Sequence, residues 1–355
     1  MRVTVLKLGS LFDGIGVFPL AAVHCGMEPV WASEIEARPI SITKRHFPDM
    51  LHLGDITKIN GAEVPPVDVI TFGSPCQDLS QIGTRNGFAG KKSSLFYQAM
   101  RIIEEMRYAT NGRYPAFCIW ENVAGAFSSN DRLDFAAMLR AFTGAEVSVP
   151  PRGWAHAGMV RGGCADTAWR LLDAQYWGEP ALAQRRKRVF VVADFAGQRA
   201  GEVLFKPRTV LPFSTISGPG GLSATQRGGV PAAQTGRQVP IVRPFSLRRM
   251  RTMAQVGDQK GFCASFGRGG EPFPTLLASV TAPFSFWYEG EERDGFLRVL
   301  TPLECERLMG LPENWTKYGC KNEEISDHAR YRALGNSIAL PCAEYVMAGI
   351  AEVMN

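Results

Sequence analysis

The first twenty-six residues read as a strand, a glycine turn and a helix, and no other feature limits the fold of this chain so strongly. Leu6 to Phe12 form an apolar run of strand length, Asp13-Gly14-Ile15-Gly16 makes a turn, and an apolar helical stretch follows. Glycines at such a turn let the backbone pass close to a bound ligand. The spacing G-x-G-x-x-G is incomplete because Pro19 replaces its third glycine, so a plain structural turn explains this stretch equally well.

Acidic residues mark the ends of the next two expected strands. Glu34 follows the strand expected over residues 29–33, and Asp55 lies near the end of the short strand expected over 51–56. An acid at the tip of the second strand of such a fold is placed to accept hydrogen bonds from ribose hydroxyls. Either acid alone fits a solvated turn or a helix cap. The ordered set of three strand ends favours an adenosine-bearing cofactor.

Cys76 stands where the apolar strand expected over 67–72 gives way to a polar loop with several glycines. Ligands bind at the carboxyl edge of open α/β sheets, so a substrate can reach a thiol there. Most single cysteines are small buried hydrophobes, and a catalytic role needs support from other parts of the chain. A further strand, expected over 116–120, delivers Glu121 to the same edge.

A basic run, residues 184–188, separates two strands expected over 168–177 and 188–193, which could form a hairpin. Arg186 and Arg188 would share one face of a strand, because alternate residues do. A solvated basic edge explains the run equally well. Helices are expected from residue 94, over 131–142, from Thr301 with a capping box, and over 339–353, whereas 147–165 is expected to be an irregular connection.

The formal net charge of +5 is unevenly distributed. Residues 195–270 hold eleven Lys and Arg against two acids, a local charge of +9 that leaves about −4 for the remainder. A basic insert on a near-neutral body favours binding to a polyanion, because Lys and Arg neutralise phosphates. A solvated loop with chance arginines is the alternative.

Length and composition narrow the class of protein. A chain of 355 residues is long enough for two units. It contains no run of about 18 uncharged apolar residues and no secretory signal pattern, so we expect no membrane association and a cytoplasmic location. The eight cysteines form no C-x-x-C pair, which predicts reduced thiols and no metal.

Taken in chain order, these motifs resemble those of the DNA cytosine-C5 methyltransferases of the bacterial or bacteriophage kind, over nearly the whole length. The matching segments are Ser10 to Gly16, Glu34, Asp55, Gly73-Ser74-Pro75-Cys76-Gln77, Glu121-Asn122-Val123, Gln184-x-Arg186-x-Arg188, Arg298-x-Leu300-Thr301 and Gly335-Asn336-Ser337. Pro-Cys-Gln alone is weak evidence, but the ordered set, with the two acids counted as one motif, makes seven motifs and is specific. A small departure is Val17, where the cofactor loop of the family often has another glycine.

The resemblance implies an α/β fold, the Rossmann-like fold of S-adenosylmethionine-dependent methyltransferases. Its mixed, mostly parallel sheet would have seven strands and carry a smaller inserted target-recognition domain. The catalytic domain would span residues 1–196 and be completed by 325–355. The target-recognition domain would span 197–297, and 298–324 would link the two.

The family's chemistry implies roles for four residues. Cytosine C5 is a poor nucleophile, and a thiolate that adds at C6 makes C5 reactive. Cys76 would be that nucleophile, in a flipped-out base, and Glu121 would protonate or hydrogen-bond N3, with a raised pKa. Arg188 would contact the cytosine carbonyl, and Arg186 would help to hold the base or its phosphate.

Binding residues also follow from the resemblance. S-adenosylmethionine, converted to S-adenosylhomocysteine, would contact Phe12, Asp13, Gly14, Gly16, Glu34, Ile35, Asp55, Ile56, Ser74, Pro75, Leu95, Asn336 and Ile338. Double-stranded DNA would contact Ser80, Arg85, Gln184, Arg268 and Thr275. We expect a monomer without a metal, and the resemblance leaves open a cognate restriction endonuclease as a partner.

Three other functions compete with DNA methylation. A tRNA cytosine methyltransferase would carry the same core motifs, but the long Arg-rich insert disfavours it. A silent DNA-binding relative would have no chemical need for Cys76, Glu121 and Arg188 together. A dinucleotide-dependent dehydrogenase would explain the glycine turn and Glu34, but it leaves the basic insert and Cys76 without roles.

Overall fold

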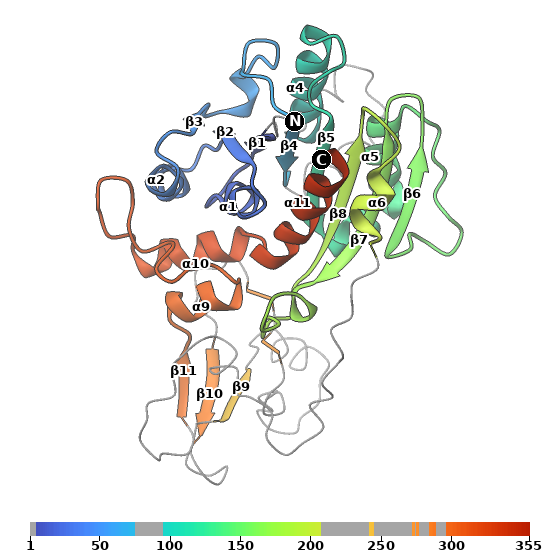
Figure 1. Ribbon diagram of the computed structural model, residues 1–355. Coiled ribbons are helices and arrows are strands. Elements are labelled where there is room, and N and C mark those ends of the chain that lie inside the picture. Colours follow the sequence, from blue (N-terminus) through green and yellow to red (C-terminus); the bar gives the residue numbers. More distant parts are fainter. Residues whose placement is uncertain are drawn as a thin grey trace.

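The computed structural model describes residues 5–74, 95–206, 241–244, 272–273, 275–276, 284–288 and 296–355. Five residues with expected roles lie outside these ranges: Pro75, Cys76, Ser80, Arg85 and Arg268. Within the described ranges the molecule has a large α/β part and a small three-stranded sheet (Figure 1).

The large sheet has eight strands in the order β3-β2-β1-β4-β5-β8-β7-β6. Strands β1 to β5 run parallel to one another, β8 pairs antiparallel with β5, and β7 and β6 continue the sheet in antiparallel fashion. The strands are β1 (Lys7–Leu11), β2 (Glu28–Ser33), β3 (Leu51–His52), β4 (Val69–Phe72), β5 (Phe117–Val123), β6 (Ala157–Arg161), β7 (Asp166–Asp173) and β8 (Lys187–Asp194). The mixed α/β sheet and the β7–β8 pairing are confirmed, but the strand count is eight, not seven.

The additional strand is β6, within the stretch that the sequence had suggested to be irregular. It pairs antiparallel with β7 at the edge of the sheet, from Ala157 opposite Arg170 to Arg161 opposite Asp166. Its residues alternate between exposed and half-buried. Gly158 within this strand, and the glycines and prolines on either side of the segment, weaken the sequence signal for a strand.

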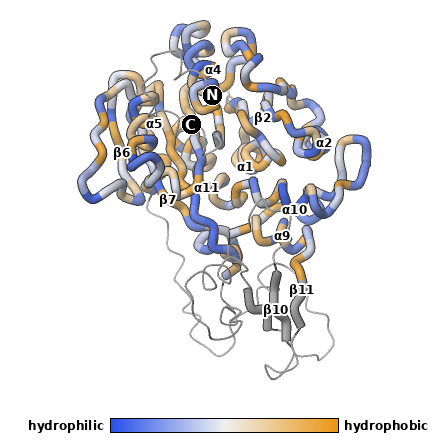
Figure 2. The backbone as a smooth tube through the Cα atoms, turned by 180° about the vertical axis from the view of Figure 1, so that it is seen from behind, coloured by the Kyte–Doolittle hydropathy of each residue, from blue (hydrophilic) through white to orange (hydrophobic). Residues whose placement is uncertain are grey.

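Helices cover both faces of the large sheet (Figure 1). One core cluster includes residues of α1 (Val17–His24), α6 (Ala200–Leu204), α10 (Asp327–Asn336) and α11 (Leu340–Met354). The other includes residues of α4 (Leu95–Ala109) and α5 (Leu133–Thr143). Figure 2 shows hydrophobic residues in the interior of the molecule at α1. Because the helices cover the faces of the sheet, the carboxyl ends of its parallel strands are where a binding site can form.

The remaining elements are short. They are α2 (Ala37–His46), α9 (Pro302–Leu308), the small-sheet strands β9 (Ile241–Pro244), β10 (Phe284–Tyr288) and β11 (Phe296–Val299), and the 3₁₀ turns Ile56–Lys58, Ala124–Phe127, Ser129–Arg132 and Ala174–Tyr176. The expected capping box at the start of α9 is confirmed, because the Thr301 hydroxyl accepts from the Glu304 amide and the Glu304 carboxylate from the Thr301 amide. Among the described residues no single helix is long and apolar enough to cross a membrane, and the α10–α11 pair, bent by 43°, passes that test only jointly.

Candidate active site

The turn after β1 has the backbone geometry of a tight ligand loop. Phe12, Gly14 and Gly16 have positive φ angles of 54°, 59° and 78°. Such angles are strained for a residue with a Cβ and are easy for glycine, which explains why Gly14 and Gly16 stand there. A non-glycine residue held at positive φ, as Phe12 is, occurs often at functional sites.

Glu34 lies against this turn. Its Oε2 accepts a hydrogen bond of 2.9 Å from the Gly14 amide, and its Oε1 accepts from the amides of Ile35 and Glu36, at 2.7 and 3.0 Å. The ends of β1 and β2 are thus joined directly. The neighbouring Ile35 side chain is 72% exposed, an apolar surface that an adenine ring could cover.

Asp13 has an unusual environment for an acid. The residue is 9% exposed, and neither carboxyl oxygen has a hydrogen-bond partner that meets normal geometry among the described residues. Burial raises the pKa of Asp13 to about 7; the charge of Glu34 adds to this, while the nearby Ser10 and Thr43 hydroxyls act against it. The carboxyl group is therefore largely protonated below neutral pH.

Asp55 precedes the 3₁₀ turn Ile56–Lys58 and caps it. Its Oδ1 accepts from the amide and the hydroxyl of Thr57, at 2.9 and 2.8 Å, which lowers the pKa of Asp55. The strand before it is shorter than expected, since β3 ends at His52. The Ser33 hydroxyl donates to the Gly54 carbonyl at 2.7 Å, so the loop that carries Asp55 is fastened to the end of β2.

Ser74, the last described residue before Cys76, is held by the neighbouring strand β5. The Ser74 hydroxyl accepts from the Trp120 indole at 3.1 Å, and the Ser74 carbonyl accepts from the Asn122 amide group at 3.0 Å. A Cβ atom placed on Gly73 would lie 3.1 Å from Oε2 of Glu121. The chain therefore enters the Cys76 segment beside Glu121. Neither the Trp120 nor the Asn122 contact had been expected, since both cross between strands.

Glu121 and Arg188 form an ion pair across β5 and β8, with 3.0 Å between Oε1 and Nε. The Glu121 side chain is 11% exposed and that of Arg188 is 14% exposed. Burial raises the pKa of Glu121, while the charges of Arg188 and Arg186 act in the opposite direction. A raised pKa is the expected property of an acid that donates a proton.

Arg186 does not lie where the resemblance suggested. Its guanidinium is fully buried and donates to three backbone carbonyls: Leu276 and Gly335, each at 2.9 Å, and Ser337. Burial and the charge of Arg188 lower the pKa of Arg186 to about 9. In this conformation Arg186 cannot contact a base or a phosphate. Its partners are distant in sequence, so strand periodicity gave no sign of them.

Two residues expected to contact DNA lie beside Arg186. Gln184 is fully buried, and its side-chain amide has no hydrogen-bond partner among the described residues. The Thr275 hydroxyl donates to the Arg185 carbonyl at 2.6 Å, so in this conformation it faces protein.

The last three described cofactor candidates differ in exposure. Leu95 begins α4 and is half-buried, Asn336 ends α10 and is exposed, and Ile338 is 7% exposed in the core cluster around α11. Ile338 therefore contributes at least partly to packing. No group of three or more potential metal ligands occurs within the described ranges.

Comparison with known proteins identifies similar DNA methyltransferases. The family model of the C-5 cytosine-specific DNA methylases matches residues 6–207 and 248–352. A type II methyltransferase of Lactococcus lactis, M1.ScrFI, is 26% identical, covering 98% of this chain and 78% of that protein. A protein of Escherichia phage P1, named a DNA N-6-adenine-methyltransferase, is 24% identical over 96% of this chain, which spans only 60% of the phage protein.

Among solved structures, the Dnmt2 methyltransferase of S. pombe is similar in fold, with a TM-score of 0.59 and 16% identity, covering 99% of each chain. The family model matches both the sheet that carries Glu34, Glu121 and Arg188 and the C-terminal helices. This chain belongs to the C-5 cytosine-specific DNA methylase family.

Proposed function

We propose that this protein transfers a methyl group from S-adenosylmethionine to C5 of a flipped-out cytosine in a specific duplex DNA sequence, through a covalent bond between Cys76 and C6. The observation that carries the proposal is the buried ion pair of Glu121 with Arg188, beside the point where the chain enters the Cys76 segment. A cation and an acid with a raised pKa suit a cytosine ring that gains negative charge.

The residues at the ends of β1 and β2 fit S-adenosylmethionine. The cofactor supplies an electrophilic methyl group. Glu34 would accept from the ribose hydroxyls in place of one of its present backbone donors, and the exposed Ile35 would cover the adenine. Asp55 would lie at the adenine end, and Asn336 at the methionine end.

Catalysis would depend on two charged side chains, Glu121 and Arg188, whose positions are fixed by strands β5 and β8. When the Cys76 thiolate adds at C6, electron density moves to the N3 and O2 side of the ring. Glu121 would donate its proton to N3, and Arg188 would donate to the carbonyl oxygen. Proton transfer of this kind contributes about 10² to 10⁴ in rate. After methylation a base such as water takes the C5 proton, the bond between C6 and the Cys76 sulfur breaks to regenerate the thiolate, and N3 returns its proton to Glu121.

Duplex DNA as the substrate is supported by charge. Residues 195–270 carry a formal +9, which favours a polyanion. We propose that residues 197–297 form the target-recognition domain between the two parts of a catalytic domain, 1–196 and 325–355, and that 298–324 link them. The three-stranded sheet β9–β10–β11 would be its framework, with the last two residues of β11 already in the linking segment.

Methylation of an adenine amino group is a second candidate, raised by the printed name of the phage P1 relative. An exocyclic amine can attack a methyl donor without covalent addition to its ring, so this reaction gives the Cys76 motif no role. Duplex DNA treated with the protein and S-adenosylmethionine, then digested to nucleosides, separates the two by mass spectrometry. We expect 5-methylcytosine; N6-methyladenine alone would refute the proposal, and methylation of tRNA but not DNA would refute the substrate.

A further inference from the structure

Phe273 and Thr275 of the inserted segment are attached to the chain just before β8. Phe273 pairs in parallel with Gln184, because the Phe273 amide donates to the Ala183 carbonyl and the Phe273 carbonyl accepts from the Arg185 amide, each at 2.7 Å. The Thr275 hydroxyl then donates to the Arg185 carbonyl at 2.6 Å. Three hydrogen bonds therefore join the insert to residues 183–185.

Arg186 extends this connection to a third part of the chain. Its guanidinium donates to Leu276 in the insert and to Gly335 and Ser337 at the end of α10. The Arg186 backbone is fixed as well, since its amide donates to Asp173 at 3.0 Å and its carbonyl accepts from the Ala174 amide at 3.0 Å. One buried side chain thus links the insert, the C-terminal helices and the last turn of chain before β8.

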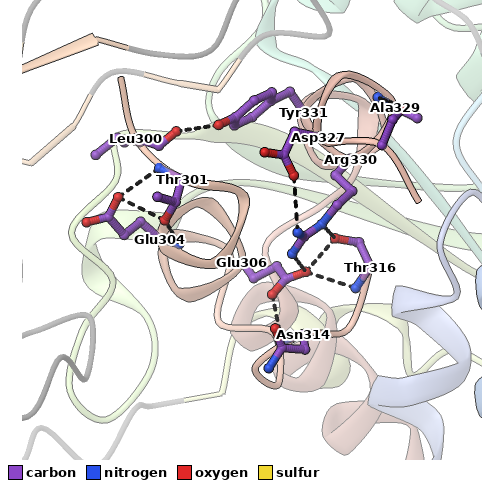
Figure 3. A network of polar contacts seen from close by, with 11 residues as sticks. Leu300, Thr301, Glu304, Glu306, Asn314, Thr316, Asp327, Ala329, Arg330 and Tyr331 are labelled. Carbon is purple, nitrogen blue, oxygen red and sulfur yellow. Dashed lines mark hydrogen bonds and ion pairs between the residues drawn. The ribbon is translucent and has the colours of Figure 1, made fainter. Parts of the chain in front are cut away.

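The end of α10 is a firm anchor for Arg186. Glu306, fully buried in α9, accepts from the amides of Asn314 and Thr316, each at 2.8 Å, and pairs with Arg330 of α10 at 3.1 Å (Figure 3). Arg330 also donates to the Thr316 hydroxyl at 3.0 Å. This network holds α10 against α9. The carbonyls of Gly335 and Ser337, at the C-terminal end of α10, are therefore fixed in position where they accept hydrogen bonds from Arg186.

We propose that Arg186 is a positioning residue that couples the insert to the catalytic pair, so that engagement of DNA by the insert sets the alignment of Arg188 with Glu121. Arg188 follows Arg186 by two residues and pairs with Glu121 at 3.0 Å. A movement of residues 272–276 would reach Arg188 through this short, hydrogen-bonded stretch. The inference rests on the proposed function.

The first test measures three quantities on Arg186→Lys, which keeps the charge but loses the planar fork of donors. We expect single-turnover methyl transfer to fall about 100-fold, since small misplacements cost that much. The dissociation constants for duplex DNA and S-adenosylhomocysteine should stay within threefold. The matched control is Lys187→Met, which removes the neighbouring exposed cation and should keep the native rate. Equal losses in both variants, or a DNA affinity that falls as far as the rate, would overturn the coupling.

A double-mutant cycle tests whether the two contacts act together. Thr275→Val removes the hydroxyl bond to Arg185 and should lower the rate about fivefold, whereas Thr275→Ser should preserve it. If both residues act through one connection, Arg186→Lys with Thr275→Val should be at most about twofold slower than Arg186→Lys alone. Fully additive losses would contradict the proposal.

A measurement on the wild-type chain avoids any variant that fails to fold. Amide hydrogen exchange at Arg185 and Phe273 should slow when duplex DNA binds, because these two amides donate the backbone bonds between the insert and residues 183–185. Unchanged exchange in a complex that methylates DNA would overturn the inference. Absence of methyl transfer by the wild-type protein would instead refute the proposed function, so the two failures are distinguishable.

Discussion

Glu121 on β5 and Arg188 on β8 lie 3.0 Å apart, and both side chains are largely buried. Removal of the acid should leave binding intact and remove a proton donor. We predict that Glu121→Gln lowers the single-turnover rate about 100-fold or more. Glu146→Gln, a change at a side chain that is 98% exposed, should keep the native rate. Full activity of Glu121→Gln would exclude the acid role.

The same pair predicts a pH dependence. Because burial raises the pKa of Glu121 and Arg188 lowers it, loss of Arg188 should raise it further. Glu121 acts in its protonated form, so the rate should decline as pH rises through this pKa. In Arg188→Met the decline should move to higher pH, whereas Arg188→Lys should keep it near the native position. A decline that does not move in Arg188→Met would contradict the assignment.

Asp13 should make stability depend on pH. Its pKa is about 7 in the folded chain and near 3.8 when exposed, so the native state holds a proton that the unfolded chain releases. This stabilisation is present below about pH 4 and is lost as pH rises toward 7 and above. Asp13→Asn should therefore be more stable than the native protein at pH 8, by at most about 4 kcal/mol, with a smaller gain at pH 5. Urea unfolding at the two pH values, with the exposed Asp49→Asn as control, measures the difference. A gain of equal size at both would argue against a buried proton.

The Glu306–Arg330 network should contribute strongly to stability. Glu306→Leu removes the carboxylate that pairs with the buried Arg330 guanidinium at 3.1 Å; among the described residues the guanidinium keeps the Thr316 hydroxyl at 3.0 Å and the more distant Asp327 at 3.4 Å. We expect a loss of about 3 to 5 kcal/mol in the free energy of unfolding. Glu313→Gln removes the charge of a carboxylate that is 54% exposed and pairs with Arg307, and it should cost less than about 1 kcal/mol because water screens that charge. Similar losses of unfolding free energy in Glu306→Leu and Glu313→Gln would contradict the prediction that the buried ion pair contributes more to stability.

The sequence located the parts of this site that lie near strand ends. Glu34 and Glu121 could be placed because each follows an apolar run at the carboxyl edge of a parallel sheet, and the structure brings Glu34 onto the Gly14 amide. Local patterns carry this information, because strand period and turn chemistry depend on neighbours in sequence.

The burial of Arg186 could not be read from the sequence. Two of its acceptors, the carbonyls of Leu276 and Gly335, are 90 and 149 residues away in the sequence. Without knowledge of these partners, a run of basic residues is interpreted as a solvent-exposed edge. The sequence failed to predict the edge strand β6 for a related reason. Its strand conformation depends on backbone pairing with β7, and its own residues give little sign of it. Both the burial of Arg186 and the formation of β6 depend on contacts between residues that are distant in the sequence.

The central claim is a covalent bond between Cys76 and the target cytosine. The direct measurement is trapping on a duplex that contains 5-fluorocytosine at the target position, in the presence of S-adenosylmethionine, followed by denaturing electrophoresis and peptide mapping. The fluorine cannot leave as a proton does, so the adduct should persist, with the DNA attached to the peptide that contains Cys76. Cys76→Ser should bind the duplex and form no adduct. Methyl transfer by Cys76→Ser at the native rate, or an adduct mapped to another residue, would contradict the account.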